Sequence, residues 1–120
     1  MNANISTHKM NNLNQIRTIL FTIDINPKYA SFEYLVRIID KLLTYRDFTQ
    51  GTYIETIINV AEKFNISPRT LSNSINYTLR NCDNNLFKQK NQFNIKQNST
   101  LNKIRIICKF VQENLCKVHQ

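Results

Sequence analysis

The chain has 120 residues, a formal net charge of +8, one glycine, two prolines and no tryptophan. This length predicts one small domain, and an apolar fraction of 42% is sufficient for a core. The scarcity of Gly and Pro argues against a fold with many tight turns. We therefore expect an all-α protein, a compact bundle of about five to six helices that contains a helix-turn-helix.

The sequence carries none of the usual signals for export, membrane insertion or metal binding. Its three cysteines form no CxxC pair, which favours a reducing compartment. The Met1 end lacks the apolar core of a signal peptide, and no apolar run approaches the length of a membrane span. We expect a cytoplasmic protein with no membrane partner, no metal and no cofactor.

The net positive charge lies entirely in the second half of the chain. Through Glu62, six basic residues balance six acidic ones, whereas from Lys63 onward ten Lys or Arg face only Asp83 and Glu113. This uneven distribution would attract a polyanion such as nucleic acid to the part of the protein that the second half of the chain forms. A solvated basic surface that only keeps the protein soluble explains the same charge equally well.

The first predicted elements are a polar tail and two amphipathic helices. Residues 1–11 show no apolar period and are expected to be flexible, and a single helical domain follows over residues 12–120. The first helix starts at Leu13 and is ended by the Asn-Pro pair at 26–27, and Ser31 is expected to cap the second. Their apolar positions are Leu13, Ile16, Leu20 and Ile23 in the first helix and Phe32, Leu35, Ile39, Leu42 and Leu43 in the second.

The centre of the chain, about 53–82, predicts two helices joined by a sharp turn. Thr52 and Glu55 have the spacing of a capping box, so we expect Thr52 to cap the first helix. Ser67 is the predicted N-cap of the second helix, and Pro68 its first residue, where the missing N–H costs nothing.

This pair has the residue spacing of a helix-turn-helix. The first helix needs a small residue where the second crosses it, the turn needs a residue that tolerates positive φ, and apolar side chains must anchor both. Six residues form this predicted scaffold: Ala61, Phe64, Asn65, Ile66, Leu71 and Ile75. Because similar spacing arises by chance in all-α proteins, a purely structural helix pair remains an alternative.

The outward face of the second helix supplies the candidate DNA contacts. The N-terminal half of such a helix reaches base edges in the major groove, where Asn pairs with adenine, the Thr methyl contacts thymine and Arg binds guanine. The base-reading candidates are Arg69, Thr70, Ser72, Asn73 and Asn76, and the phosphate-binding candidates are Lys63, Tyr77, Arg80, Lys88, Lys90 and Lys96. Plain solvation of these asparagines and loop lysines is the competing explanation.

A basic loop and a last helix complete the chain. Residues 83–100 are rich in Asn, Gln and Lys and are predicted to form the loop. The last helix, about 101–117, places five residues on one apolar face: Ile104, Ile107, Cys108, Val111 and Leu115.

Two stretches resemble the C-terminal DNA-binding domain of the sporulation master response regulator of spore-forming bacteria. The first is PKYASFEYL, residues 27–35, which matches the family in its Pro and its Tyr-Leu but has Ser-Phe at 31–32 in place of Gly-Tyr. The second is AEKFN, residues 61–65, which matches the end of the family's first helix of the pair. The two stretches align without a gap from about Ile16 to Cys82, and the last helix can be matched again.

The resemblance implies an all-helical domain that binds short promoter boxes, often as adjacent copies, and contacts RNA polymerase. The family protein has a receiver domain where this chain has a short polar tail, so we expect neither phosphorylation control nor the receiver's metal site. The family's recognition helix is rich in Arg and Glu, whereas the matching positions here are Thr70, Ser72, Asn73 and Asn76. The family's target sequence is therefore not expected to carry over.

These observations predict a sequence-specific transcriptional regulator that reads the major groove of double-stranded DNA with helix 68–82. RNA polymerase and a second copy on DNA are the further partners that the resemblance implies. An enzyme with a small-molecule substrate is not expected, because His8 and His119 lie near the two ends and no Gly-rich phosphate loop or spaced carboxylate pair exists. The alternative function is a degenerate helix-turn-helix that binds protein and modulates a full-length regulator.

Overall fold

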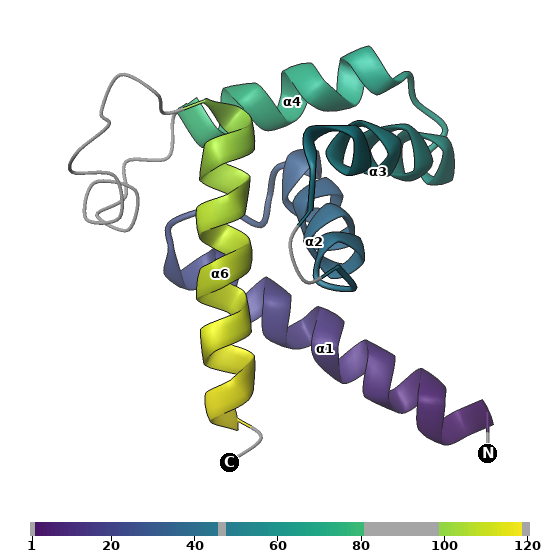
Figure 1. Ribbon diagram of the computed structural model, residues 1–120, viewed down its shortest axis with the longest axis vertical. Coiled ribbons are helices and arrows are strands. Elements are labelled where there is room, and N and C mark those ends of the chain that lie inside the picture. The colour runs from purple at the N-terminus through teal and green to yellow at the C-terminus, as the bar shows by residue number, and fades with distance from the viewer. Residues whose placement is uncertain (1, 46–47, 81–98, 119–120) are drawn as a thin grey trace.

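The computed structural model describes residues 2–45, 48–80 and 99–118, and the side chains of residues 12–45, 48–80 and 99–115. Within these ranges it contains five helices and no strand (Figure 1), so the all-α prediction is confirmed. The helices are α1 (Asn2–Thr22), α2 (Ala30–Leu42), α3 (Gln50–Lys63), α4 (Pro68–Arg80) and α6 (Thr100–Val118).

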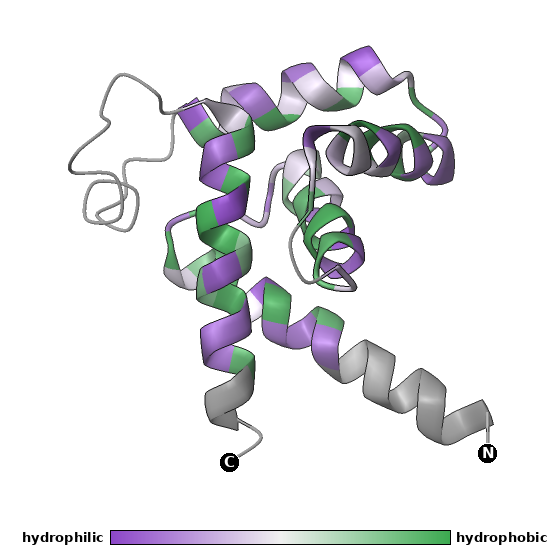
Figure 2. Ribbon diagram, viewed as in Figure 1, coloured by the Kyte–Doolittle hydropathy of each residue, from purple (hydrophilic) through white to green (hydrophobic). Residues whose placement is uncertain are grey.

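Helix α2 is the centre of the packing, because it contacts each of the other four described helices. Its residues Leu35, Val36, Ile38 and Ile39 are completely buried, and burial of such a side chain stabilises the fold by about 1.5–3 kcal/mol. Hydrophobic and hydrophilic residues alternate along α4 and α6, as helices with one buried face require (Figure 2). The apolar positions predicted for the first, second and last helices are buried or packed against this core.

Helix α1 differs from the prediction at both ends. It begins at Asn2 and so runs through most of the segment expected to be a tail. It ends at Thr22, well before the Asn-Pro pair, because Asp24 adopts positive φ (68°). The Asp24 N–H donates to the Phe21 carbonyl and the Ile25 N–H to the Leu20 carbonyl, both at 3.1 Å, which is the Schellman pattern of a helix C-terminus.

Two of the predicted helix caps are wrong. Helix α2 begins after Tyr29 with no side-chain cap, and Ser31 is buried within the helix instead. Helix α3 begins after Thr49, whose hydroxyl accepts the Thr52 N–H at 3.1 Å, so Thr52 is the capped residue and not the cap. A Thr three residues earlier provides the same chemistry and adds another turn to the helix.

Candidate nucleic-acid interface

The turn between α3 and α4 depends on the left-handed conformation of Asn65. Its φ is 57°, its N–H donates to the Glu62 carbonyl at 3.1 Å, and the Ile66 N–H donates to the Ala61 carbonyl at 3.0 Å. This is a second Schellman pattern, with Asn65 at the position that usually holds Gly. The positive φ predicted for Asn65 is confirmed, and the turn redirects the chain within a few residues.

Two substitutions at Asn65 test whether its positive φ, and not its side chain, is what the turn requires. Asn65→Val is expected to lower the free energy of unfolding by about 1–2 kcal/mol, because a β-branched residue is strained at positive φ. Asn65→Gly is expected to leave it unchanged or to raise it. Urea denaturation of both variants measures the difference, and equal destabilisation by Gly and Val would contradict the conformational explanation.

Helix α4 starts as predicted. The Ser67 hydroxyl accepts the Thr70 N–H at 3.1 Å and donates to the Thr70 hydroxyl at 2.8 Å. Pro68 is the first residue of the helix, where it needs no hydrogen-bond partner. The cap therefore holds the Thr70 side chain at the exposed N-terminal end of α4.

The six scaffold residues occupy the positions predicted for them. Ala61, Leu71 and Ile75 have no exposed surface, so α3 and α4 approach closely at Ala61 and α4 is anchored at two points. Phe64 and Ile66 are partly buried against the same core. The Phe64 ring also meets the Tyr34 ring of α2 edge to face, with 4.8 Å between centroids. The helix pair is thus fixed to the centre of the bundle.

The outward face of α4 is polar and free of carboxylates along its whole length, Pro68–Arg80. Among the base-reading candidates, Arg69, Thr70 and Asn73 are exposed, whereas Ser72 and Asn76 are half-buried. Among the phosphate-binding candidates, Lys63, Tyr77 and Arg80 are exposed. Lys88, Lys90 and Lys96 lie outside the described residues.

Helix α6 holds the C-terminal half of α4, an arrangement that the sequence pattern did not predict. The two helices meet at the N-terminal end of α6 (Figure 1). There the Thr100 hydroxyl donates to Asn76 Oδ1 at 2.5 Å, and Lys103 Nζ donates to the Leu79 carbonyl at 2.9 Å. Lys103 thereby places a positive charge at the C-terminus of α4, where the helix dipole favours it.

The contact with Thr100 changes what Asn76 can do. Bidentate pairing with adenine uses both the amide NH₂ and the carbonyl oxygen of Asn, and Asn76 Oδ1 already accepts the Thr100 hydroxyl. Asn76 is therefore better suited to position α4 than to read a base. The base-reading candidates that are exposed, Arg69, Thr70 and Asn73, lie in the first half of the helix.

Asn76→Ala is accordingly expected to weaken binding to every duplex by a similar factor. It is also expected to lower the free energy of unfolding by about 0.5–1.5 kcal/mol through loss of one hydrogen bond. Thr100→Ala is expected to do the same, and the double variant to cost less than the sum of the two. A loss confined to one base position, measured over a panel of duplexes, would instead assign Asn76 to base contact.

A buried hydrogen bond joins the C-terminal half of α4 to α2. The hydroxyls of Ser31 and Thr78 bond to each other, and the two residues are only 2% and 6% exposed. Each hydroxyl is the hydrogen-bond partner of the other. A buried hydroxyl without a partner would destabilise the fold by about 1–3 kcal/mol. This pair fixes the rotation of α4 about its axis, so the polar face keeps pointing outward.

Comparison of the chain with protein-family models, curated proteins and solved structures found no match. Among the described residues, no group of three or more His, Cys, Asp or Glu is placed to hold a metal ion. No described helix is long and apolar enough to cross a membrane.

Proposed function

We propose that this protein is a sequence-specific DNA-binding transcriptional regulator that inserts α4 into the major groove of duplex DNA. The observation that carries the proposal is the outward face of α4, which is polar, contains no carboxylate and is held in place by the core. Arg69, Thr70 and Asn73 are its exposed base-reading candidates. Direct readout needs side chains of these types on a rigid helix.

Positive charge on both sides of this face supports the proposal. Lys63 ends α3, and Arg69 and Arg80 lie near the two ends of α4, all exposed. The net charge of +8 supplies a sequence-independent attraction to phosphates. The resemblance to the sporulation regulator's effector domain adds the proposal that adjacent copies bind neighbouring boxes and contact RNA polymerase.

A protein-interaction module is the second candidate, and the surface of α3 favours it. Ile54 and Ile58 are 50% and 47% exposed one helical turn apart, and exposed Glu55 and Glu62 lie on the same helix. Adjacent exposed apolar side chains with charged neighbours are common at protein contacts. In this alternative α4 keeps its position but binds no specific DNA.

Selection of binding sites from random duplexes, followed by salt titration, separates the two candidates. For DNA binding we expect a selected sequence that binds at least about 10³-fold more tightly than random duplex. We also expect affinity to fall by orders of magnitude between low and moderate salt, because bound counterions are released. Failure to select a sequence, together with salt-insensitive or undetectable duplex binding, would favour the protein-interaction module.

A further inference from the structure

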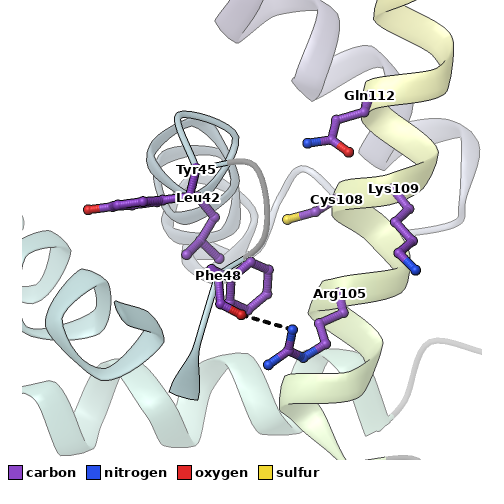
Figure 3. Close-up of a pocket in the computed structure, with 7 residues that line it drawn as sticks. All are labelled: Leu42, Tyr45, Phe48, Arg105, Cys108, Lys109 and Gln112. Carbon is purple, nitrogen blue, oxygen red and sulfur yellow. Dashed lines mark hydrogen bonds between the residues drawn. The ribbon is translucent and has the colours of Figure 1, made fainter. Parts of the chain in front are cut away.

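A cavity of about 600 Å³ lies between the C-terminal end of α2 and the middle of α6 (Figure 3), and none of its described lining residues belongs to α4. Its lining residues are Leu42, Tyr45, Phe48, Arg105, Cys108, Lys109 and Gln112. Ligand sites in proteins occupy ~300–1,000 Å³, so the cavity is large enough for a small organic molecule.

The cavity has an apolar floor. Leu42, Phe48 and Cys108 are between 1% and 7% exposed, so their side chains form its inner surface. The Cys108 side chain projects from α6 toward α2 (Figure 3). Burial raises the pKa of the Cys108 thiol to about 12, against the opposing effect of the Arg105 charge, so the thiol is uncharged at neutral pH. An apolar or aromatic group would replace water there favourably.

The α6 side of the rim is polar and positively charged. Lys109 and Gln112 are exposed, and Gln112 projects toward α2 (Figure 3). No Asp or Glu is among the described residues that line the cavity. The Lys109 side chain runs along α6 instead of toward α2 (Figure 3), so its ammonium lies at the edge of the mouth, where the polar end of a ligand bound on the apolar floor would emerge.

Arg105 forms a fixed wall of this cavity. Its guanidinium carbon lies 4.6 Å from the centre of the Phe48 ring, and its Nη1 donates to the Phe48 carbonyl at 2.9 Å. These contacts tie α6 to the residue just before the Thr49 cap of α3. Because Arg105 and Phe48 are held by each other, this wall needs little further ordering when a ligand binds, which lowers the entropic cost of binding.

We propose that this cavity binds a small organic anion with an apolar or aromatic body, its ring or chain on Leu42, Phe48 and Cys108 and its acid group at Lys109. The site is separate from α4, and ligand binding does not depend on the proposed DNA binding. It would give the protein a small-molecule ligand bound by α6, the helix that also holds α4.

Two matched probes, 2-naphthoate and its neutral analogue 2-naphthamide, test the proposal by NMR titration of ¹⁵N-labelled protein. We expect saturable shifts of amides around the cavity, with naphthoate bound about tenfold more tightly than the amide because of a charge-assisted contact. Lys109→Gln is expected to abolish this preference. Lys28→Gln, which removes the same charge from the exposed turn between α1 and α2, is expected to preserve it.

A second variant tests the cavity independently of charge. Gln112→Trp narrows the mouth and is expected to weaken both probes by a similar factor, while the spectrum of each variant reports its fold directly. Shifts that do not saturate, or that spread over the basic surface, would overturn the proposal as an adventitious effect of net charge. Equal affinity for the two probes in the parent protein would overturn the assignment of the acid group to Lys109.

Discussion

Asn73→Glu is expected to weaken binding to the selected duplex by more than about 100-fold, with little change in stability. Asn73 is exposed at the middle of the outward face of α4. A carboxylate there would meet the phosphate backbone and the acceptors of the base edges, and such like-charge contact costs several kcal/mol. Since about 1.4 kcal/mol is a factor of ten in affinity, fluorescence anisotropy with labelled duplex resolves the effect.

Asn59→Glu is the matched control, because it makes the same substitution at an exposed position of α3. Both variants lower the net charge equally, so both lose the same share of the general attraction to DNA. Only Asn73→Glu is expected to lose, in addition, the much larger binding free energy of the direct contact between α4 and the groove. Equal losses would mean that α4 does not enter the groove, and unaltered binding by Asn73→Glu would exclude the proposed interface.

The contacts that hold α4 explain why its first half is the better candidate for base contact. The Asn65 turn fixes the start of the helix, whereas the Ser31–Thr78 hydrogen bond and the contacts of Thr100 and Lys103 all hold its C-terminal half. The base-reading candidates that remain exposed, Arg69, Thr70 and Asn73, all lie in the first turns of α4. A short recognition surface of this kind favours binding of adjacent copies, which we propose for this chain.

The turn and the helix faces were predictable because they depend on residues close in sequence. Asn65 was the only residue of its turn suited to positive φ, and Ser67-Pro68 is a strong local start signal. The burial of Leu71 and Ile75 follows from helical period alone. These positions specify the candidate interface without any knowledge of the rest of the fold.

The Thr52 cap was wrong for a local reason, because Thr49, three residues earlier, takes that role. The other contacts that the sequence did not predict join polar residues that are distant in sequence. Ser31 has the composition of a helix cap, but its partner is Thr78, 47 residues away. Asn76 is a predicted base reader and stays one, but its carbonyl oxygen also accepts a hydrogen bond from the hydroxyl of Thr100, 24 residues away. No local pattern distinguishes a hydroxyl or amide that faces solvent from one that meets another helix. The cavity between α2 and α6 was unpredictable for the same reason, because its lining residues come from segments that are distant in sequence.

Ile75→Ala is expected to lower the free energy of unfolding by about 2–5 kcal/mol, the largest effect of any single substitution considered for α4. Ile75 has no exposed surface and belongs to the central core. Truncation removes apolar contacts and leaves a cavity that the packed helices around it cannot fully close. Urea denaturation monitored by circular dichroism measures the loss.

Ile58→Ala provides the comparison, because it deletes the same atoms from a side chain that is 47% exposed on α3. Its expected cost is within about 0.5 kcal/mol, since no cavity forms at the surface. Under conditions where both variants are folded, only Ile75→Ala is expected to weaken binding of DNA, because it weakens the packing of α4 against the core. A different result would point to α3 as the functional surface. In that case the unsubstituted protein would show no detectable DNA binding, and Ile58→Ala would abolish its binding to a partner protein. A large stability loss at Ile58 would contradict the packing of α3 described above.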